Sequence, residues 1–246
     1  MGYEVANPRD EEFVANVQHY FAQEGNETLF HKRNTLKVVT HQEQTYVVKS
    51  FKIPHRLNQL IYRFFRPSKA KRSYENGLRL VTLGVNTPTP IGYHEYPSRF
   101  LFGESYYISG LFAYDFEIRA VLKDPAFEGR EAILEAFVAF TYDLHTKGVY
   151  HVDYSPGNIL VKALEGGYHF SLIDLNRMEF LSLDSALRMK SLAKLTSNRE
   201  DNYTLVTLYA KHSGECVEEL WGLLEGYLEK QQRYLSRKKR LKKLKG

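Results

Sequence analysis

The chain has 246 residues, of which 43% are hydrophobic and 14% are aromatic, so it can bury a substantial core and is too apolar for a disordered protein. Its single cysteine, Cys216, excludes a disulfide framework and favours a reducing compartment. No apolar run reaches the roughly 18 residues of a membrane span, and the acidic first residues carry no secretory signal, which predicts a soluble or at most peripheral protein.

The net charge of +5 is distributed unevenly along the chain. Residues 237–246 contain seven Lys or Arg and no acidic residue, whereas the rest of the chain has 27 basic and 29 acidic residues. Between Glu43 and Glu75 there are eight Lys or Arg and no acidic residue. Each basic segment is either a solvated surface or a binding site for an anionic partner, a substrate or a membrane. No nucleic acid is expected, because no recognition module accompanies the charge.

The first half of the chain predicts strands around one helix. Three segments of residues 27–52, "ETLFHK", "TLKVVT" and "TYVVKSF", are rich in strand formers and are separated by short polar stretches. Residues 66–84 predict a helix that has Pro67 in its first turn, ends at Gly84 and has an apolar face of Ala70, Tyr74, Leu78 and Val81. Residues 87–96 and 104–110 predict further strands, and two prolines place the first at a sheet edge.

The second half predicts a long helix, a polar loop, a hairpin and a helical end. Residues 125–148 predict a helix with an apolar stripe of Ile133, Phe137, Phe140 and Leu144. "NILVKA" and "HFSLIDL", joined by "EGG", predict a hairpin, and residues 182–246 are mostly helical in pattern. We therefore predict an α+β fold with a sheet-rich lobe, residues 1–108, and a mainly helical lobe, residues 109–246, that ends in the basic tail 237–246.

The polar loop between the predicted long helix and the predicted hairpin contains the candidate catalytic residues. "HVDYSPGN", residues 151–158, has the spacing His-x-Asp-x-x-x-x-Asn. Phosphoryl transfer needs a carboxylate near the attacking hydroxyl and oxygen ligands for Mg²⁺. We interpret Asp153 as the base and Asn158 as a catalytic and metal-binding residue, and the hairpin predicts that Asp174 comes beside Asn158 as a second ligand. Asp153 as a turn-capping residue is the alternative, and His151 fits a scaffold role better than proton transfer.

These residues resemble the catalytic loop and metal-binding aspartate of the protein-kinase-like superfamily. The resemblance implies ATP and Mg²⁺ as cofactors, with Lys49 binding the α- and β-phosphates and Glu75 as its ion-pair partner. Glu75 as a solvated helix residue is the alternative. Lys52 competes for the phosphate role, but strand alternation places it on the opposite face from Lys49. "YYISGLF", residues 106–112, resembles the adenine-binding hinge, with Ser109 and Leu111 among the residues that contact the nucleotide.

The chain departs from the protein-kinase pattern in four places. Residues 26–76 contain no glycine, so Lys32, Arg33 or backbone amides would cover the phosphates in place of a glycine-rich loop. The metal-binding triplet is "DLN" in place of Asp-Phe-Gly, no Ala-Pro-Glu follows, and Ser155 stands where many protein kinases have a lysine. These departures disfavour a conventional protein kinase.

A closer resemblance is to the bacterial lipopolysaccharide kinase family of Kdo kinases and core heptose kinases, over about residues 25–215. It is carried by "RNTLKVV", by "YVVKSFKIPHRLNQLIYRFFRPSKAKRSYENGLRLVTLGVNTPTPIGY", by "HVDYSPGNIL" and by "IDLNRM". The resemblance implies transfer of the ATP γ-phosphoryl group to a sugar hydroxyl of the inner core. The substrate would be a lipid-linked anionic saccharide, and the enzyme would be cytoplasmic or peripheral on the inner face of the cytoplasmic membrane.

Two questions stay open at this point. The basic tail either forms an interfacial helix on anionic lipid or follows a packed terminal helix as a disordered end. An atypical protein kinase and a catalytically inactive kinase-like scaffold at the membrane are the alternative functions. A scaffold would need none of the five residues Lys49, Glu75, Asp153, Asn158 and Asp174, so their presence argues against it.

Overall fold

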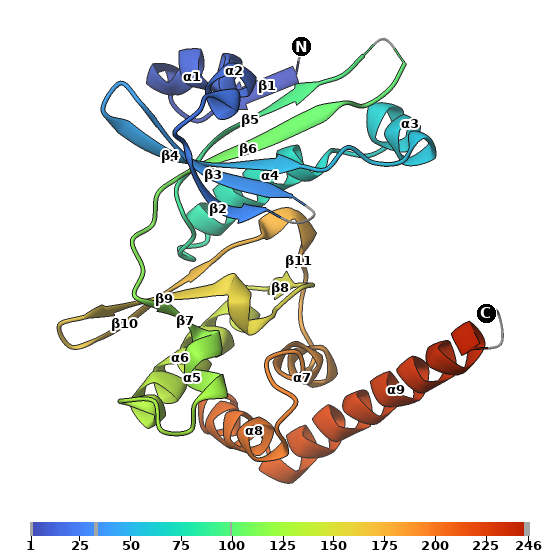
Figure 1. Ribbon diagram of the computed structural model, residues 1–246. Helices are drawn as coiled ribbons and strands as arrows, with labels where there is room; N and C mark the ends of the chain where they lie inside the picture. Colours follow the sequence, from blue (N-terminus) through green and yellow to red (C-terminus); the bar gives the residue numbers. More distant parts are fainter. Residues whose placement is uncertain (1, 32–33, 99, 244–246) are drawn as a thin grey trace. The chain divides into compact units, whose positions relative to one another are not determined.

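The computed structural model describes residues 2–31, 34–98 and 100–243, which form two compact units (Figure 1). The first unit comprises Met1–Ala113 with Ser171–Arg177, and the second comprises Tyr114–Phe170 with Met178–Gly246. A seven-residue segment from the second half of the sequence is thus part of the first unit. The division predicted at residues 108 and 109 stays a prediction.

The first unit is built on a six-stranded antiparallel sheet in the order β1-β5-β6-β4-β3-β2. Its strands are β1 (Gly2–Val5), β2 (Glu27–His31), β3 (Thr35–His41), β4 (Gln44–Phe51), β5 (Pro90–Tyr96) and β6 (Glu104–Gly110). The five strands predicted from the sequence are confirmed. The predicted edge position of β5 was wrong, because β1 covers that side and Pro90, as the first residue of β5, stands where a missing N–H is tolerated.

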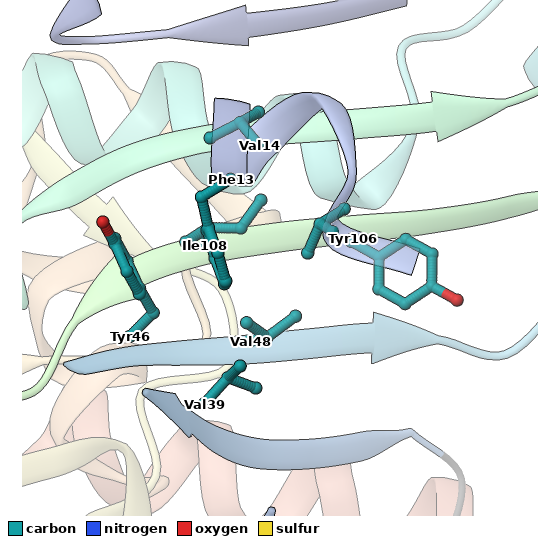
Figure 2. Packing of buried hydrophobic residues seen from close by; sticks show 8 residues of the cluster. Phe13, Val14, Val39, Tyr46, Val48, Tyr106 and Ile108 are labelled. Carbon is teal, nitrogen blue, oxygen red and sulfur yellow. The ribbon is translucent and has the colours of Figure 1, made fainter. Parts of the chain in front are cut away.

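One face of this sheet packs against two short N-terminal helices, α1 (Glu11–Ala15) and α2 (Val17–Ala22), preceded by the 3-10 turn η1 (Pro8–Asp10). Phe13 and Val14 from α1 lie over Tyr46, Val48 and other sheet residues (Figure 2). The rings of Phe13 and Tyr46 stack with centroids 4.0 Å apart. Burial of this apolar cluster stabilises the face of β4 that points away from Lys49.

The other face of the sheet packs against α4 (Lys69–Thr82), which confirms the predicted helix, although Pro67 precedes the N-cap and is not in the first turn as predicted. Ser68 caps it by accepting a hydrogen bond from the Lys71 N–H at 3.0 Å. The predicted apolar face was only half right, since Ala70 and Tyr74 are buried but Leu78 and Val81 are exposed. The buried side of α4 includes Gly77. A Cβ at this position would lie 2.7 Å from the Pro90 side chain, so only glycine allows the helix to pack this closely.

The segment between β4 and α4 contains a further helix, α3 (Arg56–Phe64), that the sequence pattern did not predict. His55 precedes it without a side-chain cap, and the helix has only nine residues. Short uncapped helices give weak local signals, because tertiary context decides whether they form.

The second unit contains two small sheets and five helices within the residues that the structure describes. One sheet has the order β10-β9-β7, and the other pairs β8 with β11. The strands are β7 (Phe116–Glu117), β8 (Val149–His151), β9 (Ile159–Leu164), β10 (Gly167–Leu172), whose last two residues belong to the first unit, and β11 (Met178–Phe180). The helices are α5 (Ile118–Lys123), α6 (Arg130–Thr146), α7 (Ser185–Leu192), α8 (Arg199–Ser213) and α9 (Val217–Lys243). The predicted long helix, hairpin and helical end are confirmed.

The C-terminal helix α9 is packed only in its first half. Leu220 and Leu224 are buried, whereas Tyr234 and Leu235 are exposed. The helix continues to Lys243, so the described part of the basic tail is helical. Of the helices in the described ranges, none has the length and apolarity that crossing a membrane requires.

A buried polar pair connects α6 with α8. His145 is buried, and its Nδ1 lies 2.9 Å from the hydroxyl of Tyr209 on α8. Burial, with a smaller contribution from the charge of Arg188, lowers the pKa of His145 to about 3. The native state therefore holds this imidazole neutral, whereas the unfolded chain protonates it near its ordinary pKa of about 6.5.

We expect His145 to make stability depend on pH. The unfolded state binds one more proton below about pH 6.5, so this stability is complete above that pH and is lost as the pH falls towards 3. Between pH 7 and pH 5 the wild type should lose about 2 kcal/mol more free energy of unfolding than His145→Gln. Urea unfolding of both proteins at the two pH values tests this, and parallel pH dependence would contradict it.

Candidate active site

Lys49 and Asp174 form the centre of the site in the first unit. Lys49 lies in β4 on the face that also carries Phe51, and its Nζ is 5.3 Å from the Phe51 ring centroid. The Nζ donates a hydrogen bond to Asp174 Oδ1 at 2.7 Å, in a partly buried ion pair. Lys52, the competing lysine, is exposed beyond the end of β4. The structure therefore brings two of the predicted site residues together.

Backbone contacts fix the segment that carries Asp174. The Leu172 N–H donates to the Asn86 carbonyl at 3.0 Å, and the Thr87 hydroxyl donates to the Leu172 carbonyl at 2.8 Å. Asn76 of α4 donates through Nδ2 to the Leu175 carbonyl at 2.7 Å. These bonds attach residues 172–175 to the same unit as Lys49.

The Asp174 side chain is oriented by its own backbone and by a neighbour. Its φ of +59° lies in the left-handed region, which Asp and Asn tolerate better than most residues. The chain then enters the 3-10 turn η3 (Leu175–Arg177), from which Asn176 Nδ2 donates to Asp174 Oδ1 at 2.6 Å. Lys49 and Asn176 thus share one carboxylate oxygen. The sequence analysis missed Asn176, although its place two residues after a candidate ligand was a usable signal.

Glu75 is not brought to Lys49. Its carboxylate lies 3.7 Å from the ammonium of Lys71, one turn earlier in α4, and is about half exposed. The expected Lys49–Glu75 ion pair is therefore absent from the described residues, because Tyr74 fills the buried side of the helix while Glu75 faces outward beside Lys71. A role of Glu75 in nucleotide binding stays a prediction.

The expected hinge residues differ in their surroundings. Ser109 is buried in β6, where it pairs with Val47 of β4 and Pro90 of β5. Leu111 is exposed just beyond the end of β6. Their contacts with a nucleotide stay predictions, and the expected phosphate-covering residues Lys32 and Arg33 lie outside the described residues.

The loop after β8 in the second unit is a closed hydrogen-bonded turn. The Asp153 N–H donates to His151 Nδ1 at 3.1 Å. The Asp153 carbonyl accepts from the Ser155 N–H at 2.7 Å and from Asn158 Nδ2 at 2.9 Å. His151 is buried, which agrees with a scaffold role. Asp153 and Asn158, five residues apart, are therefore joined through main-chain and side-chain contacts, and the 3-10 turn η2 (Pro156–Asn158) completes the loop.

The hydrogen bond of Asn158 defines which of its side-chain atoms is left for a ligand. Asn158 Nδ2 donates to the Asp153 carbonyl. The amide oxygen Oδ1 accepts no hydrogen bond within the part of the chain that the structure describes, so it is the atom that could bind a ligand. An amide oxygen and a carboxylate are ligands that Mg²⁺ accepts. The described residues contain no cluster of three or more His, Cys, Asp or Glu that could hold a metal. Asn158 in the second unit and Asp174 in the first each carry a side-chain oxygen of the kind that a hard cation accepts, and their binding of one metal stays a prediction.

Many solved structures are similar to this chain, among them two that match over most of both chains. WaaP, in a complex with acyl carrier protein, is 18% identical, with a TM-score of 0.64 over 96% of this chain and 99% of that chain. A candidate aminoglycoside phosphotransferase from Ralstonia eutropha is 12% identical, with a TM-score of 0.52 over 87% of this chain and 82% of that chain. Both likenesses support the kinase-like α+β fold that the sequence predicts. No curated protein matches the sequence significantly.

The lipopolysaccharide kinase (Kdo/WaaP) family model matches residues 23–207, which is most of the chain. The chain belongs to the lipopolysaccharide kinase family. This confirms the resemblance seen in the sequence, and the protein is a phosphotransferase that acts on a sugar hydroxyl. The matched residues include Lys49, Asp153, Asn158 and Asp174.

Lys194 contacts the residues just before the candidate catalytic loop, and the sequence analysis missed it. Its Nζ donates to the Val152 carbonyl at 2.8 Å and to the Tyr150 hydroxyl at 2.9 Å. Burial raises the pKa of Tyr150 to about 12, and the charge of Asp153 contributes in the same direction. The lysine therefore ties the segment after α7 to the residues that precede the candidate base. No local sequence signal marks it, since it is 41 residues away from Asp153.

Arg119 of α5 packs on the same loop. A Cβ at Gly157 would lie 1.6 Å from Nη2 of Arg119, so the guanidinium occupies the space that a side chain at position 157 would fill. Glycine is therefore required for this contact. The guanidinium is about half exposed, and its Nε lies 3.5 Å from Glu117.

We expect Gly157→Ala to displace Arg119 at a small energetic cost, because the end of a flexible side chain can move away. The free energy of unfolding should fall by about 1 kcal/mol or less, and the change should vanish when Arg119→Ala is already present. Denaturant unfolding of the two single variants and the double variant measures this coupling. Lys123→Ala, an exposed change on α5, is the control, and additive effects of Gly157→Ala and Arg119→Ala would contradict the expectation.

Proposed function

We propose that this kinase transfers the γ-phosphoryl group of ATP to a hydroxyl of Kdo or heptose in the lipopolysaccharide inner core, with Mg²⁺ as cofactor. The observation that carries the proposal is the 2.7 Å pair of Lys49 and Asp174, held within one unit of a lipopolysaccharide kinase family member. A phosphate-binding ammonium and a metal-binding carboxylate are the two charges that a bound nucleotide requires.

Each residue has a distinct role in the proposed reaction. Lys49 binds the α- and β-phosphates, and Asp174 with Asn158 holds the metal, whose chemistry is to neutralise charge on the phosphate oxygens. Asp153 accepts the proton of the attacking sugar hydroxyl. The hydrogen bonds from Asn158 and Ser155 to the Asp153 carbonyl keep the loop fixed while the proton moves. Ser109 and Leu111 contact the adenine side of the nucleotide, and Glu75 and Arg33 are further nucleotide-binding candidates.

The acceptor is proposed to be an anionic saccharide linked to lipid, presented at the cytoplasmic face of the inner membrane. Two features support this: the family of the chain and the positive charge of its C-terminal helix. Arg233, Arg237 and Lys238 of α9 are all exposed, which suits adsorption to an anionic lipid surface.

The test is a phosphoryl-transfer assay with purified protein. We expect ATP labelled at the γ-phosphate, with Mg²⁺, to transfer label to a deacylated inner-core oligosaccharide, and mass spectrometry to locate one added phosphate on Kdo or heptose. A general protein substrate such as casein serves as the competing acceptor. Transfer to casein and not to the saccharide would favour an atypical protein kinase, and transfer to neither would favour a scaffold. Either outcome would overturn the proposal.

A further inference from the structure

The helix α3 turns apolar side chains towards solvent. Leu60, Ile61 and Phe64 share one side of the helix, and all three are exposed, as is Phe65 directly after it. The exposed fractions of Phe64 and Phe65 are 59% and 84%. A surface helix normally buries its apolar side, so this orientation is the reverse of the usual one.

Polar and aromatic contacts hold the opposite side of α3 to the first unit. Gln59 Nε2 donates to the Pro54 carbonyl at 2.8 Å. The ring of Tyr62 lies 5.8 Å from the ring of Phe102, which precedes β6. Figure 1 shows α3 beside the β5–β6 hairpin of the same unit. The outward direction of the apolar side therefore follows from specific contacts on the inward side.

Positive charge surrounds the exposed apolar residues. Lys52, Arg56, Arg63 and Arg66 are exposed, and no acidic residue occurs between Glu43 and Glu75. The Arg63 guanidinium lies 5.6 Å from the Phe64 ring centroid, so charge and aromatic surface are directly adjacent. We define the α3 patch as Ile53, Leu60, Ile61, Phe64 and Phe65 together with these four basic residues.

We propose that the α3 patch docks on an anionic lipid bilayer, with its apolar side chains in the interfacial region and its basic side chains on the lipid phosphates. Phe and Leu beside Arg and Lys is the composition of helices that lie in a membrane interface. The segment between Glu43 and Glu75 has no acidic residue, so an anionic surface complements its charge. Each basic residue close to such a surface strengthens the electrostatic attraction to the lipid. The site is separate from the α9 tail and does not depend on which sugar is phosphorylated.

A vesicle sedimentation assay with the full chain and no nucleotide tests the proposal. Vesicles of phosphatidylcholine alone are compared with vesicles of equal parts phosphatidylcholine and phosphatidylglycerol. We expect Phe64→Ser/Phe65→Ser to lower the partition coefficient on the anionic vesicles at least about tenfold, because two aromatic side chains no longer enter the interface. Arg63→Gln/Arg66→Gln should reduce binding only at low salt. Leu164→Ser, an exposed leucine at the end of β9, is the matched control and should bind normally.

A fluorescence measurement distinguishes insertion of the α3 patch into the bilayer from adsorption of the basic tail, residues 237–246. The chain has one tryptophan, Trp221, so Trp221→Phe with Phe65→Trp places a single reporter in the α3 patch. We expect its emission to shift to shorter wavelength with anionic vesicles, also after deletion of residues 237–246. Unchanged emission, or normal vesicle binding by Phe64→Ser/Phe65→Ser, would overturn the proposal. Phe64→Ser/Phe65→Ser should transfer the phosphoryl group to a soluble acceptor as the wild type does. A failure of the membrane proposal can therefore be distinguished from a failure of the proposed function.

Discussion

Asp153→Ala should reduce turnover by ~10²–10⁴ while nucleotide binding stays close to that of the wild type. The carboxylate is proposed to accept the proton of the sugar hydroxyl, whereas the loop itself is held by backbone groups. The Asp153 N–H bonds to His151 and its carbonyl accepts from Asn158, and alanine retains both groups. Turnover measured at saturating ATP and acceptor, together with calorimetric titration of nucleotide, gives the two quantities.

The control for this variant is Asp143→Ala, which removes a half-exposed carboxylate from α6 where it pairs with Lys147. It should leave turnover unchanged, because Asp143 is in the helix and not in the catalytic loop. Normal turnover by Asp153→Ala would refute its assignment as the base. A loss of nucleotide binding in proportion to turnover would instead indicate that the residue supports the metal.

Asp174→Asn should abolish Mg²⁺-dependent nucleotide binding. Asparagine keeps the size of the side chain and tolerates the φ of +59°, whereas alanine would add backbone strain to the loss of charge. The change removes the carboxylate that pairs with Lys49 at 2.7 Å and that is proposed to hold the metal. Calorimetric titration of ATP with and without Mg²⁺ measures the effect.

Asn176→Ala is the matched comparison for this experiment. It removes the second donor to Asp174 Oδ1 and leaves the carboxylate in place, so nucleotide affinity should fall by roughly tenfold or less. Equal, Mg²⁺-dependent ATP affinity in the wild type and Asp174→Asn would mean that Asp174 holds no metal. Thermal unfolding of both variants shows whether the fold is retained.

The sequence predicts those elements whose pattern is local. The strands around Lys49 and the long helix α6 have clear periodicity, and Gly84 marks the end of α4. By contrast, β1 and β11 were missed because each is short and forms only by pairing with a distant strand. The helix α3 was missed although Leu60, Ile61 and Phe64 lie at helical spacing, because it has only nine residues and no side-chain cap marks its start.

The candidate site shows the same difference between residues placed by a local sequence pattern and residues placed by tertiary structure. Asp153 and Asn158 lie in one continuous motif, so their common placement in one loop could be predicted from the sequence, whereas their chemical roles stay predictions. Lys194 and Arg119 contact that loop from other helical segments, and only tertiary structure brings them there. The partner of Lys49 in this structure is Asp174 and not Glu75, a choice that depends on side-chain directions that no spacing encodes.

Residues 171–177 belong to the unit formed by the first 113 residues, so the polypeptide passes between the two units three times. A fragment ending at Ala113 would therefore lack its final inserted piece and would leave the ammonium of β4 without its counter-ion. Neither half of this kinase corresponds to an uninterrupted stretch of gene. Duplication or exchange of one half by simple recombination would separate Lys49 from Asp174, the two charges that the proposed reaction uses together.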